Sequence, residues 1–364
     1  MRRRVLLTSV GAFAARPGHE WLTGAFGADA GRATGTQLAM EIVEHLETVT
    51  DRLRRMDDRL GGMRTLNLVR GHLATVVDLI QGRRYDDTVG RRLHGSAAEL
   101  LRLAGWLCFD GSAHRQAERF WLAALREAHT AGDRALGANI LGFMSCQAKD
   151  LGQIRGAVAL AETARAGYPA ASPRVSTILD LRAAEAYAND RDTTACRTAI
   201  DAAFAHLAKP GPPHGDPAWC YWVTEAQAHA QAGYCYVRLE DWARARRHLR
   251  HAIGLQGIQF SREGALRNAL LATTYVRQEH PDLDMALHLG DQAVVTLSGQ
   301  VSSARCVTHV HRLVTSLRPY RRDPAVRRFV DKTRPLLRAD ANARPSGRVA
   351  ADQPSSTPPH QWKA

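Results

Sequence analysis

One pattern of small residues recurs five times along the chain and limits it to a stack of helices. A small residue at position 117, 157, 196, 245 or 286 is followed by a second residue four positions on and by another small residue three further on. This spacing is helical, and small residues on one helix face let a neighbouring helix approach closely. The five triplets are Ala117, Trp121 and Ala124; Ala157, Ala161 and Ala164; Cys196, Ile200 and Ala203; Ala245, Leu249 and Ala252; and Ala286, Gly290 and Ala293.

A second helical pattern precedes each triplet, with a small residue three positions before an aromatic or small one. Its members are Gly105 and Cys108, Ser145 and Ala148, Ala184 and Tyr187, Gly233 and Tyr236, and Ala272 and Tyr275. The triplets lie 40, 39, 49 and 41 residues apart, whereas a standard TPR hairpin repeats every 34 residues or so. We therefore predict an all-α fold, a TPR-like α-solenoid of antiparallel helical hairpins, with about five degenerate repeats in residues 95–300.

Composition agrees with this fold class. Hydrophobic residues make up 45% of the chain and aromatic residues only 6%, so alanine supplies much of the apolar surface, as closely packed helices allow. Alternating runs typical of strands are hard to find. A plain helical bundle would not require a recurring period.

Further helices flank the repeats. Apolar residues from Leu38 to Leu60 recur at helical spacing, a second run from Leu66 to Ile80 follows, and the two predict a long-helix hairpin in residues 36–85. Residues 301–338 predict two C-terminal capping helices. Residues 339–364 are rich in Pro, Ser and Ala and predict a disordered tail. The Pro-rich residues 209–218 predict a surface loop, against which Trp219 and Trp222 pack.

The N-terminal segment, residues 1–35, has two interpretations. Arg2, Arg3 and Arg4 precede an apolar run at residues 5–15, as in a short twin-arginine export signal. The alternative is a linker or helix at the head of a cytoplasmic protein. The run is too short to span a membrane.

The formal charge of +13 favours an acidic partner such as nucleic acid, a membrane surface or an acidic polypeptide. However, lysine occurs only at positions 149, 209, 332 and 363, and an excess of arginine and alanine is typical of a GC-rich genome. We therefore expect nucleic-acid binding to be only weak or indirect.

Motifs of catalysis and metal binding are missing from the sequence. It holds no GxSxG, P-loop, HExxH or dinucleotide fingerprint. The six cysteines form no CxxC and are predicted to be reduced core thiols. His248 and His251, and His309 and His311, form close pairs without carboxylate or cysteine ligands in register. We therefore predict no enzyme activity, no cofactor and no metal.

Three stretches give the chain a resemblance to a known family. They are RRRVLL at residues 2–7, LRRMDDRLGG at residues 53–62, and AERFWLAALREAHTAGD at residues 117–133. Through them, residues 1–338 resemble the C-terminal TPR region of actinobacterial XRE-type helix-turn-helix transcriptional regulators. The resemblance implies ligand sensing, partner binding and a cytoplasmic location.

One departure from that family bears on DNA binding. The family's regulators begin with a helix-turn-helix domain, and no such domain precedes residues 2–4 here. We expect a stand-alone TPR protein, a truncated regulator, or a chain whose start is misassigned. The resemblance carries no DNA-contacting residue over to this sequence.

In a solenoid, the first helices of the hairpins line the concave face. The predicted register places nine polar or aromatic candidates there: Glu99, Arg102, Trp106, Asn139, Lys149, Glu185, Gln227, Tyr234 and Asn268. Side-chain amides pair with a peptide backbone, and Arg102 and Lys149 suit a carboxylate.

We thus predict a non-enzymatic regulatory protein that binds a peptide, small ligand or protein partner on this face, and a homodimer is a further option. The alternatives are an exported TPR scaffold and a basic DNA-associated regulator.

Overall fold

A computed structural model describes residues 38–60, 62–212, 215–257, 261–299 and 303–343. The basic-apolar segment at residues 1–35 and the tail residues 344–364 lie outside these ranges. The described residues form fourteen α-helices and no strand, and adjacent helices pack in sequential pairs. The predicted all-α hairpin array is therefore confirmed. None of the described helices combines the length and the apolarity that crossing a membrane requires.

The helices follow one another as hairpins. The bounds are α2 Met40–Leu60 and α3 Gly62–Gly82; α4 Asp87–Asp110 and α5 His114–Ala131; α6 Arg134–Asp150 and α7 Ile154–Gly167; α8 Pro173–Asn189 and α9 Thr193–Leu207; the 3₁₀ helix η1 Ala218–Trp222; α10 Glu225–Arg238 and α11 Trp242–Gly254; α12 Ser261–Arg277 and α13 Leu283–Ser298; and α14 Ala304–Ser316, η2 Arg318–Tyr320 and α15 Pro324–Ala343. The last helix extends five residues beyond position 338, into the segment predicted to be disordered.

Side-chain caps explain where many of these helices begin. Asp133 accepts a hydrogen bond from the backbone N–H of Leu136, and Asp192 accepts one from that of Ala195. Asp86, Thr224, Asp241, Asp282 and Ser303 cap other helices in the same way. Each cap satisfies a backbone donor that the first helical turn leaves without a partner.

The small residues of the repeat pattern are the points where paired helices approach most closely. The first residue of every triplet is fully buried. A Cβ atom added to Gly105 of α4 would collide with the indole of Trp121 on α5, and one added to Gly233 of α10 would lie 2.7 Å from Leu249 on α11. The glycine of the first helix thus receives the large central residue of the second.

This packing predicts opposite outcomes for two glycine-to-alanine changes. Gly105→Ala is expected to lower the free energy of unfolding by about 1–3 kcal/mol, because Trp121 must shift. Gly71→Ala in α3 meets no atom within 4 Å and is expected to raise it by roughly 0.5–1 kcal/mol through a better helix propensity. Urea unfolding of the two variants tests this. Equal effects of the two changes would contradict the packing scheme.

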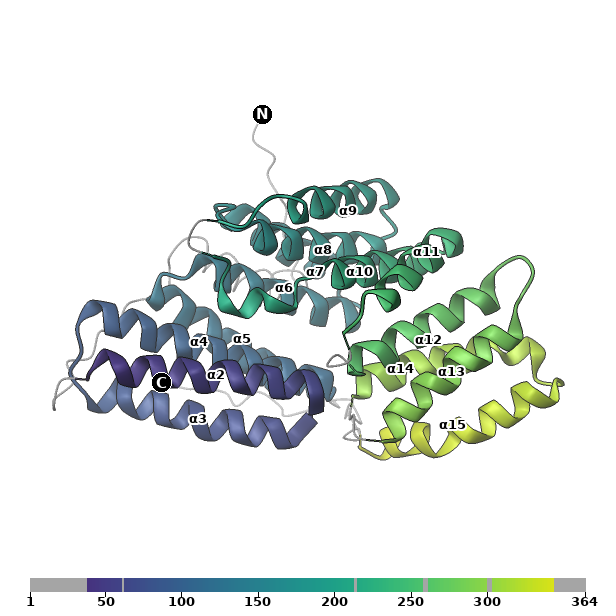
Figure 1. The fold of residues 1–364 in the computed structure, drawn as a ribbon, viewed down its shortest axis with the longest axis horizontal. Coiled ribbons are helices and arrows are strands. Elements are labelled where there is room, and N and C mark those ends of the chain that lie inside the picture. The colour runs from purple at the N-terminus through teal and green to yellow at the C-terminus, as the bar shows by residue number, and fades with distance from the viewer. Residues whose placement is uncertain (1–37, 61, 213–214, 258–260, 300–302, 344–364) are drawn as a thin grey trace, which may run out of the picture.

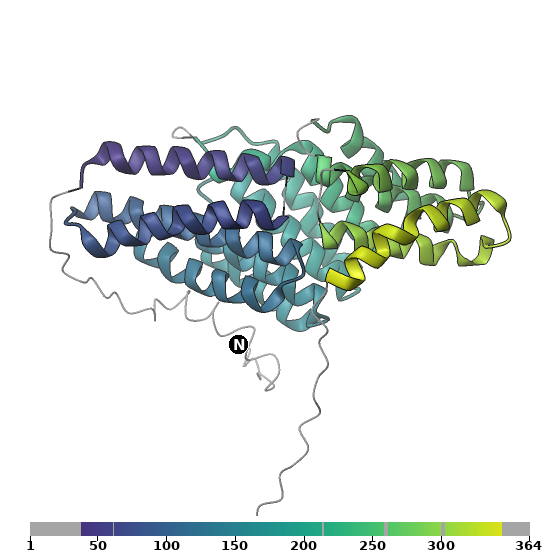
Figure 2. The same cartoon turned by 90° about the horizontal axis from the view of Figure 1, so that it is seen from below.

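The hairpin array curves until its first four helices contact its last four. Figure 1 shows α2–α5 as one arm, α12–α15 as the other, and α6–α11 joining them, and Figure 2 shows the same arrangement from below. The first helices α4, α6, α8, α10 and α12 contact one another along the inner face, and α2 contacts α4, η1 and α12. The N-terminal hairpin is therefore part of the inner wall as well as an end of the stack.

Candidate functional site

A cavity of about 460 Å³ lies on the inner face, between the two arms. Its wall is built by α2, α4, α6, α8, η1, α10, α12 and α14. The aromatic part of the wall consists of Trp106, Phe109, Phe143, Tyr221, Trp222 and Tyr234. Charged side chains from both arms share this wall with the aromatic ones. A cavity of this volume lies within the range of small-molecule sites.

The structure brings six of the predicted site residues together at this cavity. They are Arg102, Trp106, Lys149, Glu185, Gln227 and Tyr234. Three predicted candidates do not line it. Asn139 is buried within α6, Asn268 points toward α13 and donates to Gln292, and Glu99 pairs with Arg54.

Glu185 of α8 is the centre of one buried ionic cluster. Its carboxylate lies 2.8 Å from Lys149 Nζ and 3.1 Å from the Arg182 guanidinium, and it accepts a hydrogen bond from Gln231. Burial alone would raise the pKa of Glu185, but the charges of Lys149 and Arg182 outweigh it and lower that pKa to about 2. Glu185 is therefore ionised throughout the physiological range.

The ammonium group of Lys149 contacts three neighbouring side chains. Its Nζ lies 2.7 Å from Asp150 as well as 2.8 Å from Glu185, and it donates to the Tyr234 hydroxyl at 3.2 Å. The sequence-based expectation that Lys149 binds a ligand carboxylate would require it to exchange one of these partners. In the structure, Lys149 contacts Glu185 and Tyr234 in the wall.

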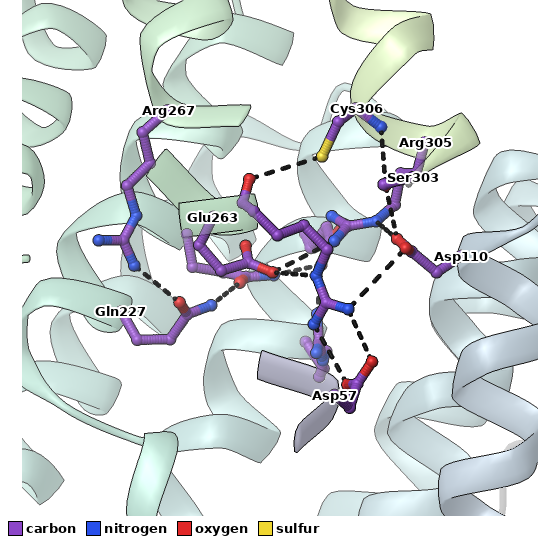
Figure 3. Close-up of polar contacts among 12 residues, drawn as sticks. Asp57, Asp110, Gln227, Glu263, Arg267, Ser303, Arg305 and Cys306 are labelled. Atoms are coloured by element: carbon purple, nitrogen blue, oxygen red, sulfur yellow. Dashed lines mark hydrogen bonds and ion pairs between the residues drawn. The ribbon is translucent and has the colours of Figure 1, made fainter. Parts of the chain in front are cut away.

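A second ionic cluster closes the curved array, as Figure 3 shows. Arg262 of α12 lies 2.9 Å from Asp57 of α2 and 3.9 Å from Asp110 at the end of α4. Asp110 also accepts from Ser303 Oγ at 2.9 Å and from Arg305 of α14 at 3.1 Å. These contacts join residues about 200 positions apart and hold the two arms together.

Trp106 contacts two guanidinium groups of that cluster. Arg262 and Arg305 lie 5.5 Å and 5.1 Å from its ring centre. Cations at this distance are attracted to the negative face of an indole. The closing cluster therefore also fixes one aromatic wall of the cavity.

Arg102 of α4 and Arg267 of α12 are the two cavity arginines that form no ion pair with a carboxylate of the described residues. Only 5% of Arg102 is exposed, and its Nε has no hydrogen-bond partner. The guanidinium lies 5.7 Å from the ring centre of Phe143. Burial, with the nearby charge of Arg54, lowers the pKa of Arg102 to about 10, so it still carries its charge at neutral pH.

Arg267 shows how a cavity arginine is satisfied without a carboxylate. It donates to the side-chain oxygens of Gln256 and Gln227, at 2.9 and 3.1 Å, and to the backbone oxygen of Ala252 at 3.3 Å. Arg102 has no comparable set of acceptors among the described residues. Arg102 is therefore a buried guanidinium in the cavity wall that forms no ion pair with the described residues.

Asp58 of α2 is a half-buried carboxyl at the edge of the cavity. Tyr221 of η1 donates a hydrogen bond to it. Burial raises the pKa of Asp58 to about 6, even though the hydrogen bond from Tyr221 and the charge of Arg262 oppose this shift. Asp58 therefore changes its protonation state close to neutral pH.

This shift predicts a pH dependence of stability. Because the pKa of Asp58 in the folded protein lies above its usual 3.8, the folded state holds the proton more tightly, and stability falls as pH rises from about 4 to about 6. Asp58→Asn, which mimics the protonated form, is expected to be more stable than wild type above pH 6, by about 1–3 kcal/mol. Urea unfolding of both proteins at several pH values measures the difference. A difference that does not change with pH would contradict the shift.

The structure agrees with the prediction that the cysteines are buried in the core and form no disulfide. All six cysteines lie within the described residues, and each is buried without a disulfide. Cys146 and Cys306 line or border the ionic clusters, where burial raises the pKa of each thiol to about 12. Each thiol is also a weak donor, from Cys146 Sγ to Glu185 at 3.6 Å and from Cys306 Sγ to the backbone oxygen of Arg262 at 3.7 Å.

The residues that join the two arms were not predicted from the sequence. Asp57, Asp110, Arg262 and Arg305 were not among the predicted site residues, although Asp57 lies in one of the stretches that carry the family resemblance. One usable signal was present: Asp110 follows the apolar stretch Leu107, Cys108 and Phe109, and all four residues are buried.

Comparison with protein-family models and with curated proteins assigns the chain to no family. No protein-family model matches the chain, and no curated protein matches it.

Proposed function

We propose that this chain is a regulatory helical-repeat protein whose cavity binds a small ligand, or the end of a peptide, that carries a carboxylate or another anionic group. The observation that carries the proposal is Arg102, a buried and charged guanidinium that forms no ion pair with a carboxylate of the described residues. A buried charge is costly unless it is paired, and a bound anion would supply the pair. The planar fork of arginine suits a carboxylate through two parallel hydrogen bonds.

The rest of the cavity favours an organic acid with an aromatic or aliphatic body. Phe143 and Trp106 offer apolar surface close to Arg102. Gln227 and Gln231 offer amide groups that donate and accept hydrogen bonds. A volume near 460 Å³ suits a small molecule or a few peptide residues better than a long extended peptide.

The position of the cavity provides a route from ligand to regulation. Its wall includes Asp57 and Arg262, which belong to the contacts between the two arms. A ligand that binds the closed array better than an opened one shifts the protein toward the closed form. The resemblance to XRE-type regulators supports transcription as the process that such a change would control, through a protein partner.

A thermal-shift screen tests the proposal. Pairs of small aromatic and aliphatic acids and their uncharged amides are compared in a buffer free of carboxylate and phosphate. Acids are expected to raise the melting temperature, since a ligand that binds only the folded state stabilises it, and the matched amides are expected to have little effect. Equal stabilisation by the amides, or by none of the acids, would contradict an anion-binding cavity.

A further inference from the structure

A cluster of imidazoles and one carboxylate lies on the α10–α11 hairpin, at the rim of the cavity. Glu225 and His229 are four residues apart on α10 and thus share one helix face. His251 of α11 faces them: its Nε2 lies 3.3 Å from Glu225 Oε1, while His229 Nε2 lies 3.8 Å from the same oxygen. One ligand atom from each residue lies within 4.8 Å of the other two.

These separations match the edges of a metal coordination polyhedron. Zinc binds imidazole nitrogen and carboxylate oxygen at about 2.0–2.2 Å in a tetrahedron, whose edges then measure roughly 3.4 Å. The observed separations of 3.3 and 3.8 Å lie close to that length. Two histidines and one glutamate are a ligand set that zinc accepts with water in the fourth position.

His248 contacts the ring nitrogen of His229 that does not face Glu225. The Nδ1 atoms of these two residues lie 2.9 Å apart, a contact in which one ring donates its hydrogen and the other accepts it. When His229 is the donor, its Nε2 is unprotonated and faces Glu225. Metal-binding histidines usually have such a partner on the second nitrogen. The ring centres of Phe204 and His229 lie 4.7 Å apart, so these two rings pack against each other.

Nearby arginines do not occupy the site. Arg246 donates to Gln278, and Arg250 donates to the Tyr275 hydroxyl, so both extend toward α12. Arg247 remains on the same surface as the cluster, and Glu225 supplies the negative charge that a cation there requires.

From this geometry we propose that the α10–α11 hairpin binds one zinc ion through Glu225, His229 and His251, with His248 as the positioning residue for His229. The inference does not depend on the anion-binding proposal. The sequence alone predicted no metal, because it showed His248 and His251 as a pair without a carboxylate in register. The fold supplies that carboxylate from the preceding helix.

The proposal is tested by titrating zinc chloride into the full chain, freed of any histidine tag, in a calorimeter. We expect one zinc ion per chain. Glu225 and His251 are at least half exposed, so Glu225→Gln and His251→Ala should fold normally, and each is expected to weaken binding by more than about 100-fold. His248→Ala is expected to weaken it by roughly 10- to 100-fold, as for other outer-shell partners.

A matched control and a second readout complete the test. His280→Ala removes an exposed histidine outside the cluster and should bind zinc as wild type does. Cobalt in place of zinc should give the visible absorption of a four-coordinate ion with nitrogen and oxygen ligands, and Glu225→Gln should abolish it. Wild-type affinity in His251→Ala, or equal losses in His280→Ala, would overturn the site, as would binding at several equivalent positions.

Discussion

Replacing Arg102 with methionine is expected to weaken binding of the anionic ligand by roughly 100-fold while leaving the fold intact. A hydrogen bond to a charged group contributes about 1.5–3 kcal/mol, so the loss of a two-pronged contact reaches this size. Methionine keeps an unbranched side chain of similar length at this buried position. Because the guanidinium is buried and no carboxylate in the described part of the chain pairs with it, its removal should also raise the free energy of unfolding of the ligand-free protein.

The combination of lost binding and gained stability separates a binding residue from a structural one. Calorimetry with the best acid of the screen measures the affinity, and urea unfolding measures the stability. Arg197→Met, at an exposed arginine of α9, is the control and should change neither. Arg102→Lys keeps the charge but loses the fork and should retain only part of the affinity. A destabilised Arg102→Met variant with unchanged affinity would contradict the assigned role.

Asp110→Asn is expected to destabilise the protein by about 3–5 kcal/mol, the usual cost of breaking a buried ion pair. Asp110 is 2% exposed and takes contacts from Arg262, Arg305 and Ser303. Removal of its charge leaves two buried guanidinium groups with fewer carboxylates. The contact between α4 and α14 should weaken first, so backbone amides early in α14 should exchange hydrogen faster.

An exposed ion pair provides the control for Asp110. Asp291 and Lys332 lie 2.7 Å apart, with nearly half of each side chain exposed. Asp291→Asn should cost less than about 1 kcal/mol, because solvent screens such pairs. Urea unfolding and hydrogen exchange of both variants provide the comparison. A cost for Asp110→Asn as small as that for Asp291→Asn would show that the cluster does not hold the arms together.

The helices and their buried faces could be predicted from the sequence, and the reason is physical. Helical spacing of small and apolar residues determines which face of each helix is buried, and this face needs no knowledge of distant residues. In the structure, Gly105 meets Trp121 and Gly233 meets Leu249 within single hairpins, and all four residues belong to the patterns read from the sequence. The same register put Arg102, Glu185 and Tyr234 on the inner face, where the structure has them.

Contacts between residues far apart in the sequence could not be predicted from helical spacing. The curvature of the array is the total of a small rotation at each repeat. No residue pattern within a single repeat predicts that total curvature. The meeting of Asp57 with Arg262, and of Asp110 with Ser303, depends on that total. Asn268 shows the limit even locally, since it lies beside Arg267 in the sequence yet its side chain donates to Gln292 of α13 rather than lining the cavity.

The most direct test of the anion-binding cavity is a crystal structure of the protein with the best acid of the screen. We expect the acid group within about 3.2 Å of the Arg102 guanidinium, with the body of the ligand against Phe143 and Trp106. The two arms should remain joined through Asp57 and Arg262. An acid bound on the outer face of the array, or inside the cavity with its charged group away from Arg102, would contradict the account.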